Sequence, residues 1–190
     1  TLVQKTVLIT GCSGQLGQRL CRDLANDFNI IPTYKKYQDK KNKLDLTNKN
    51  DFEYIFSIYN PDIIINCGAL TDVDYCDENH KHCHDVNVSG LTNLIKYSQK
   101  KTKIIHISSD YVFDGNKDIP YTETDLTHPI NYYGKTKLEA ENNLIGSEKN
   151  NYLIFRPNVI YSEIGSNFFM FIYNSLKNNF TDCLLTMSRE

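Results

Sequence analysis

Two adjacent tyrosines precede a lysine in the segment "HPINYYGKTKLEAE" (128–141), a pattern that can carry proton-transfer chemistry. On a helix, Tyr133 and Lys137 are one turn apart and lie on the same face, whereas Tyr132 points elsewhere. A phenol has a pKa of about 10 and is a poor acid–base group near neutrality, but a neighbouring ammonium stabilises the phenolate and lowers that pKa. Tyr133 alone would be interpreted as a packing residue, and its pairing with Lys137 favours a catalytic role.

A second hydroxyl group of the right kind stands in the segment "HISSDYVFDG". When a carbonyl is reduced by hydride its oxygen must be protonated, and a hydroxyl that orients this oxygen is expected at the end of a nearby strand. Ser109 is the better candidate, with Ser108 as a neighbour that contacts cofactor or backbone. Ser109, Tyr133 and Lys137 together predict a catalytic set.

The segment "GCSGQLG", Gly11 to Gly17, joins a predicted strand to a predicted helix. Glycine there lets the backbone turn tightly and approach a pyrophosphate, while the helix N-terminus offers N–H donors and a positive dipole end. The alternative is an ordinary tight turn. The spacing G-x-x-G-x-x-G is typical of the extended branch of the short-chain dehydrogenase/reductase superfamily, so the turn predicts binding of a nicotinamide dinucleotide.

Residues just after the second predicted strand should choose between the two nicotinamide cofactors. Lys35 and Lys36 stand where a cation would accept a 2′-phosphate, which favours NADPH while leaving NADH open, and the alternative is that both are solvated surface lysines. Asp45, in "LDLT", falls where members of the superfamily that this turn resembles use an acid to hold the adenine amino group. The structural alternative for this stretch is a helix N-cap at Thr47 or Asn48.

The segment "CDENHKHCH" (76–84) is a second candidate functional site. On one helix Cys76, His80 and Cys83 would share a face, and such side chains can bind zinc. Because the segment falls in a loop and at a helix start after a strand, we favour a solvated surface and expect no metal site.

The elements that must position these residues alternate along the chain. Alternation of strands and helices predicts an α/β fold with a Rossmann-type, doubly wound parallel sheet, because parallel neighbours need a crossover that is usually helical. Strands are expected over 5–10, 29–34, 62–69, 103–109 and 151–157, and helices over 17–28, 48–60, 87–101, 132–145 and 168–179.

The bulk composition narrows the class of protein. The 190 residues are 40% hydrophobic with a net charge of −2, which fits one soluble core and lacks the basic footprint of a nucleic-acid binder. Apolar runs are far shorter than the roughly 20 residues of a membrane span. Six cysteines without a compact secreted spacing favour a reduced, cytoplasmic setting. The sequence leaves open whether the chain is a monomer or a homodimer.

The motifs resemble those of the dTDP-4-dehydrorhamnose reductase family of extended short-chain reductases. The matching segments between residues 10 and 161 are "TGCSGQLG", "DLTN", "PDIIINCGALTDVDYCDEN", "NVSG", "HISSDYVFDG", "PYTETDLTHPINYYGKTKLEAE" and "IFRPNVIY". The resemblance implies an oxidoreductase of dTDP-rhamnose biosynthesis that uses NADPH or NADH to reduce the 4-keto group of a nucleotide-linked 6-deoxy sugar.

The resemblance also implies roles for matching residues. Ser109, Tyr133 and Lys137 would be catalytic, with Tyr133 and Lys137 also contacting cofactor, and Ser109, Asp110 and Tyr133 would lie at the sugar. The remaining cofactor contacts would come from Gly11, Gly14, Gln15, Leu16 and Gly17 at the pyrophosphate, Lys35 and Lys36 at the 2′-phosphate, Asp45 and Leu46 at the adenine, and Ala69, Leu70 and Thr71 in the centre.

Two features separate the chain from this family. Val159 stands where some relatives place a large aromatic residue against the substrate, and relatives continue for roughly another hundred residues, a typical size for a small domain. We expect residues 1–165 to form the NAD(P)-binding domain and 166–190 to begin a substrate-binding region. The alternatives are a non-catalytic subunit like the regulatory β subunit of methionine adenosyltransferase, which carries similar motifs, and a remnant that binds cofactor only.

Overall fold

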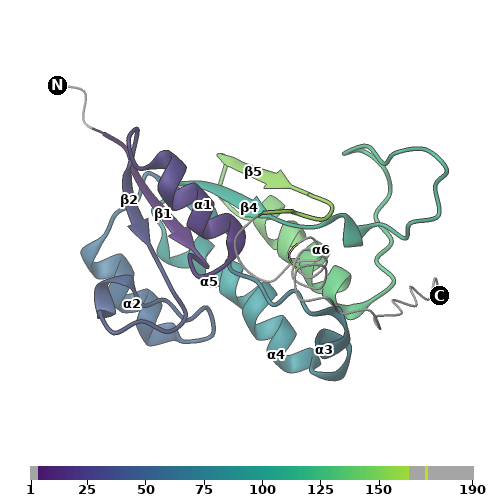
Figure 1. Ribbon diagram of the computed structural model, residues 1–190, viewed down its shortest axis with the longest axis horizontal. Coiled ribbons are helices and arrows are strands. Elements are labelled where there is room, and N and C mark those ends of the chain that lie inside the picture. Colours follow the sequence, from purple (N-terminus) through teal and green to yellow (C-terminus); the bar gives the residue numbers. More distant parts are fainter. Residues whose placement is uncertain (1–3, 163–169, 171–190) are drawn as a thin grey trace. The chain divides into compact units, whose positions relative to one another are not determined.

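The computed structural model describes residues 4–162 and residue 170. Five strands alternate with helices, as the sequence predicts (Figure 1). The strands are β1 (Thr6–Thr10), β2 (Asn29–Pro32), β3 (Ile63–Asn66), β4 (Lys103–Ile107) and β5 (Tyr152–Phe155), and the helices are α1 (Gln15–Leu24), α2 (Lys49–Ile58), α3 (Val73–Glu78), α4 (His80–His84), α5 (Gly90–Tyr97) and α6 (Tyr132–Ile145).

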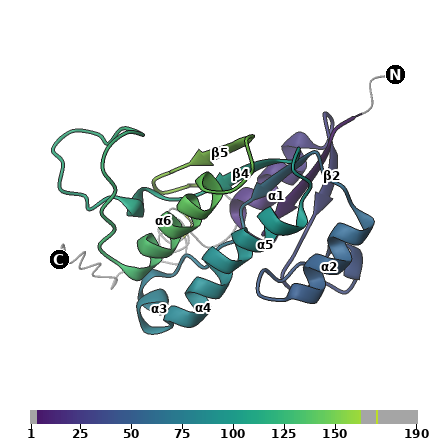
Figure 2. The same ribbon diagram turned by 180° about the vertical axis from the view of Figure 1, so that it is seen from behind.

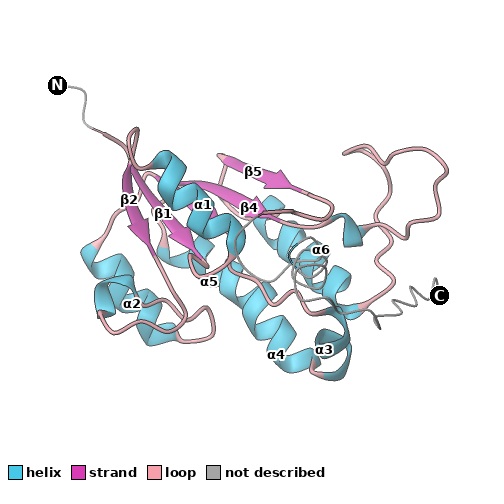
Figure 3. Cartoon of the chain, viewed as in Figure 1, coloured by secondary structure: helices cyan, strands magenta, loops and turns pink. Residues whose placement is uncertain are grey.

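The strands form one parallel sheet in the order β2-β1-β3-β4-β5 (Figure 3). All five therefore end at the same edge. The chain order reverses at β1, so the carboxyl ends of β1 and β3 flank a topological switch point, where open α/β sheets place their ligands. The doubly wound parallel fold is confirmed.

Each face of the sheet is covered by its own apolar layer. On one face, Leu8, Ile64 and Ile104 pack with residues of α2, α5 and α6, which lie in front of the strands in Figure 2. On the opposite face, Val7, Ile9 and Ile65 pack against the α1 side chains Leu20, Cys21 and Leu24. This two-sided burial explains why the strands are almost continuously apolar rather than alternating.

The region between β3 and β4 differs from the sequence prediction. A helix was expected over 87–101, but helical structure starts at Val73 and ends at Tyr97. Asp72 caps α3 by accepting a hydrogen bond from the Tyr75 N–H, and α4 runs through a π-helical turn, Asp85–Ser89, directly into α5.

The chain divides into two compact units, Thr1–Asn158 and Val159–Glu190. The expected domains 1–165 and 166–190 remain a prediction. The helix expected over 168–179 falls outside the described residues apart from Met170. Among the described residues, none of the helices is both long and apolar enough to cross a bilayer.

Candidate active site

Helix α6 carries the predicted tyrosine and lysine into the protein interior. Asn131 caps the helix by accepting the Gly134 N–H at 2.7 Å. Tyr133 and Lys137 are buried, at 7% and 1% exposure, and the Lys137 Nζ donates to the Ile107 carbonyl at 2.7 Å. The lysine thereby joins α6 to the carboxyl end of β4. Tyr132 is only half-buried and stacks on the His80 ring, which agrees with its pointing elsewhere.

Ser109 meets Tyr133 because a short turn after β4 packs tightly against α6. The Ser109 Oγ accepts the Tyr111 N–H and caps the 3-10 turn Asp110–Val112, and it donates to the Asp110 carboxylate at 3.2 Å. A side chain at Gly134 would place its Cβ 2.2 Å from the Tyr111 carbonyl oxygen. Glycine in "YYGK" is therefore what lets the two hydroxyl-bearing segments approach.

The electrostatics of Tyr133 differ from the sequence expectation. Burial raises the pKa of Tyr133 to about 12, and the hydrogen bond with Ser109 is the largest influence in the opposite direction. The expectation that Lys137 brings this pKa down is wrong for this structure. A raised pKa keeps the proton on the phenol, which is the form that a proton donor needs.

The pKa of Lys137 is shifted in the opposite direction. Burial lowers its pKa to about 8, and the Glu141 carboxylate on the next turn of α6 opposes that shift. An ammonium taken out of water loses its hydration, so its neutral form gains in relative stability. Lys137 is still mostly protonated at neutral pH, and its charge lies beside His106, whose pKa it helps to lower.

The glycine turn closes over the switch point as the sequence suggests. Gly11 has φ +68°, and a Cβ there would lie 2.8 Å from the Gly68 Cα and N atoms. Gly14 precedes α1, and within the described residues no side chain caps that helix and its first turn holds no acidic residue. The backbone at this turn therefore forms a cradle that side chains would fill, and it suits a pyrophosphate.

A ladder of polar side chains beneath the switch point was not predicted. Thr10, Asn66 and His106 are in register on β1, β3 and β4. The Thr10 hydroxyl donates to the Asn66 Oδ1 at 2.6 Å and accepts the Gly68 N–H at 3.0 Å, and the Asn66 Nδ2 lies 3.2 Å from the His106 Nδ1. The sequence does carry a signal for this ladder, because each of the three strands has a polar residue near its carboxyl end, after a run of apolar residues.

The remaining predicted cofactor residues lie around the same edge. Leu46 is buried, and its side chain would clash with a Cβ atom added at Gly68 or at Gly90. Leu46 therefore packs directly under the switch point. Asp45 accepts hydrogen bonds from the Thr47 N–H and hydroxyl, while Asn48 is the actual N-cap of α2. Among the other predicted cofactor residues, the buried one is Gly17, and the half-buried ones are Gln15, Leu16, Ala69 and Leu70. The exposed ones are Gly14, Lys35, Lys36 and Thr71.

Leu70 is fixed by a residue that sequence reasoning did not single out. The Asn87 side chain accepts the Leu70 N–H at 2.8 Å and donates to its carbonyl at 3.0 Å. Asn87 also donates to the Thr136 hydroxyl of α6 at 3.1 Å. The segment after β3 is therefore tied to the helix that carries Tyr133 and Lys137.

The cysteine and histidine cluster is a solvated surface only in part, because His80 is exposed and the two cysteines are not. Cys76 and Cys83 are fully buried and pack against Tyr133, and His80 faces Tyr132 from a different helix than Cys76. The segment does not form one helix because α3 ends before His80. Among the described residues, no group of three or more His, Cys, Asp or Glu side chains could hold a metal ion.

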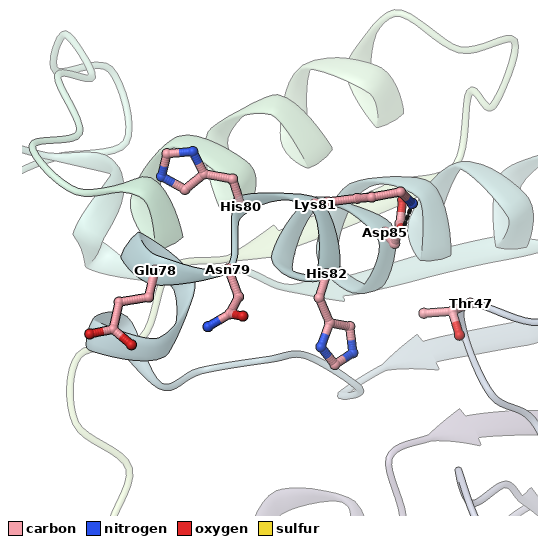
Figure 4. Close-up of a pocket in the computed structure, with 7 residues that line it drawn as sticks. All are labelled: Thr47, Glu78, Asn79, His80, Lys81, His82 and Asp85. Atoms are coloured by element: carbon pink, nitrogen blue, oxygen red, sulfur yellow. Dashed lines mark hydrogen bonds and ion pairs between the residues drawn. The ribbon is translucent and has the colours of Figure 1, made fainter.

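A surface hollow of about 530 Å³ lies beside α3 and α4 (Figure 4). Asn79 and His82 point to the side on which Thr47 lies, whereas His80 points away from it. No predicted catalytic residue contributes to its walls, which are formed by Thr47, Glu78, Asn79, His80, Lys81, His82 and Asp85.

Comparison with known proteins agrees with this geometry. A family model described as the RmlD substrate binding domain matches residues 5–181. The chain belongs to this family. This RmlD-family chain is 35% identical over 173 residues to a dTDP-4-dehydrorhamnose reductase from Aggregatibacter actinomycetemcomitans, covering 90% of this chain and 57% of that relative. The family resemblance drawn from the sequence is confirmed.

Two further relatives bear on function. The crystal structure of dTDP-4-dehydrorhamnose reductase from Bacillus anthracis, in complex with NADP, matches with a TM-score of 0.84 at 32% identity, covering 93% of this chain and 61% of that one. Methionine adenosyltransferase 2 subunit beta from Bos taurus is 32% identical over 165 residues, 84% of this chain and 48% of that relative. This RmlD-family chain spans about half the length of these curated relatives.

Proposed function

We propose that the chain is the cofactor-binding and catalytic part of an NADPH-dependent reductase of the 4-keto group of a nucleotide-linked 6-deoxy sugar, of the dTDP-4-dehydrorhamnose type. The observation that supports the proposal is that Tyr133 lies within hydrogen-bond reach of Ser109, while Lys137, one turn further along α6, is bonded to the Ile107 carbonyl at the end of β4. The names of the relatives support the substrate class.

A nicotinamide dinucleotide, when bound, would supply the hydride that reduces the carbonyl carbon. Tyr133 holds a proton on its phenol and donates it to the carbonyl oxygen, and Ser109 donates a hydrogen bond that orients this oxygen. Lys137, one turn further along the same helix face, is held by the Ile107 carbonyl and is proposed to contact the bound cofactor. Asp110, next to Ser109, is proposed to contact the sugar.

The dinucleotide would lie across the switch point. The glycine cradle of Gly11, Gly14 and Gly17, with Gln15 and Leu16, would hold the pyrophosphate, and Asp45 and Leu46 the adenine. Ala69, Leu70 and Thr71 would line the centre, followed by Tyr133 and Lys137. Lys35 and Lys36 are exposed just after β2, where a cation would accept a 2′-phosphate, which supports NADPH over NADH. The NADP-bound relative supports the same choice.

One specific observation favours a second candidate function, that of a non-catalytic regulatory subunit. The bovine methionine adenosyltransferase subunit covers nearly as much of the chain, at similar identity, as the reductases do. A chain that keeps the catalytic residues can belong to either class, so turnover has to decide.

The deciding experiment compares Tyr133→Phe with Tyr132→Phe in a protein that carries this chain and a complete substrate-binding part. We expect Tyr133→Phe to slow NADPH-dependent reduction of the keto-sugar nucleotide by about 10²- to 10⁴-fold, because it removes the proton donor and keeps the ring's packing. Cofactor affinity should stay nearly unchanged. Tyr132→Phe is the matched control and should do little. Equal, near-full activity of both variants would put the regulatory function first.

A further inference from the structure

Two thiols lie in contact beneath the glycine turn. Cys12 belongs to the turn itself and Cys21 to α1, and their Sγ atoms are 3.2 Å apart. The Cys21 thiol donates to the Cys12 sulfur, and the Cys12 thiol donates to the Ile9 carbonyl at 3.2 Å. Both cysteines are reduced in this arrangement. The stretch of chain between them contains the remainder of the turn and the start of α1.

The two thiols differ in access. Cys12 is 2% exposed, whereas Cys21 is half-buried, so reagents in solution meet Cys21 first. Burial raises the pKa of Cys12, with Cys21 adding to the effect, which makes Cys12 inert towards dissolved reagents. Cys12 can still react with a sulfur atom that is held against it, because proximity replaces a bimolecular encounter.

We propose that Cys12 and Cys21 form a reversible intrachain disulfide on reaction with a low-molecular-weight disulfide, and that this bond weakens dinucleotide binding at the glycine turn. Cys21 releases its proton to water and attacks one sulfur of the reagent, forming a mixed disulfide as one reagent thiolate leaves. Cys12 then releases its proton and attacks the Cys21 sulfur, and the second reagent thiolate leaves. The cysteine pair loses two electrons and the reagent is reduced to two thiols.

The turn has little room for this bond. A disulfide brings its sulfur atoms to about 2.05 Å, so the 3.2 Å gap must close by more than about 1 Å. A Cβ at Gly17 would already lie 2.5 Å from the Gly11 carbonyl oxygen and 2.9 Å from the Cys12 Cα, so α1 is packed hard onto the turn. Because Cys12 lies in the turn and Cys21 on α1, we expect closing the gap to shift α1 relative to the turn. The effect on binding rests on the function proposed above, whereas disulfide formation does not.

The test incubates the folded protein with oxidised glutathione and identifies disulfides by peptide mapping and mass. We expect a bond that joins Cys12 to Cys21, with the loss of two hydrogens, and its reversal by dithiothreitol. Titration calorimetry with NADPH should then show at least about tenfold weaker binding by the oxidised protein than by the reduced protein. The fully buried Cys76 and Cys83 should stay unmodified in the same sample.

Two variants control the experiment. Cys67→Ser changes a third thiol that packs beside this pair, and it should keep both the disulfide and its effect. Cys21→Ala should bind NADPH equally with and without oxidant. A folded wild-type protein that forms no Cys12–Cys21 bond overturns the proposal, and so does a bond that leaves NADPH affinity unchanged. If the reduced protein does not bind NADPH, the function proposed above fails, while peptide mapping still decides whether the pair is a redox site.

Discussion

The carboxylate of Glu141 accepts hydrogen bonds from the Arg156 Nε at 3.0 Å and from its Nη2 at 2.6 Å, one helical turn beyond Lys137. The Glu141 side chain is 0% exposed and that of Arg156 is 21% exposed. The pair therefore anchors α6 to the segment that follows β5. The hydrogen bond with Glu141 raises the pKa of Arg156, so the guanidinium stays charged.

Breaking this ion pair should destabilise the fold. Arg156→Met leaves the Glu141 carboxylate buried without its partner, and we expect a loss of about 3–5 kcal/mol in the free energy of unfolding. The double variant Glu141→Leu/Arg156→Met removes both charges and should recover most of that loss. Urea denaturation measures both. A double variant as unstable as Arg156→Met would show that the cost comes from lost packing rather than from an unpaired charge.

Gly11→Ala should cost more than Gly115→Ala, although both glycines have positive φ, +68° and +75°. Nothing lies within 4 Å of a Cβ at Gly115, so that variant measures backbone strain alone, about 1–2 kcal/mol. At Gly11 the Cβ also meets the Gly68 backbone at 2.8 Å, which adds about 1–3 kcal/mol of overpacking. Denaturant unfolding of the two variants gives the difference. Equal costs would mean that the contact between the turn and Gly68 is loose.

Lys137 should make stability depend on pH. Its folded-state pKa of about 8 is below its ordinary value of 10.5, so the unfolded chain takes up the proton first as pH falls. Stability is therefore lost between about pH 10.5 and pH 8, by about 3 kcal/mol in full, and rises again with increasing pH.

The corresponding measurement is the free energy of unfolding at pH 8 and at about pH 9.5, for the wild type and for Lys137→Met. The wild type should gain stability relative to the variant as pH rises. The upper limit avoids the window in which the raised pKa of Tyr133 lowers stability. Parallel profiles would show that Lys137 is not desolvated in the folded protein.

The double variant Lys35→Asp/Lys36→Asp tests cofactor choice. The wild type should bind NADPH more tightly than NADH, because an exposed ammonium can pair with the 2′-phosphate. The variant should lose that preference, since carboxylates repel the phosphate and can accept a hydrogen bond from a ribose hydroxyl. Lys40→Asp/Lys41→Asp, in the neighbouring exposed basic pair, is the matched control. Equal wild-type affinities for the two cofactors would remove both lysines from the site.

Local sequence rules were sufficient for α6, which spans Tyr132–Ile145 as expected, because its N-cap Asn131 and the spacing of its buried residues are set by one continuous stretch of sequence. They failed before α5, where a solvated segment was expected and Cys76 and Cys83 are instead buried under Tyr133. The Thr10–Asn66–His106 ladder and the pKa of Tyr133 depend on contacts and burial set by strand register, which neighbouring residues in the sequence do not encode.

The π-helical turn Asp85–Ser89 has a consequence for insertions and deletions. A π turn holds one residue more than the α-helical turn it replaces, and one residue rotates an α-helix by roughly 100°. Deleting a single residue between Asp85 and Ser89 would turn the π turn into an α turn, so the flanking helices escape that rotation and Cys83 keeps its contact with the Thr136 hydroxyl, now at 3.5 Å. In an alignment of homologous chains, a one-residue gap at this turn therefore marks an α turn in place of the π turn, with the helices on either side unrotated.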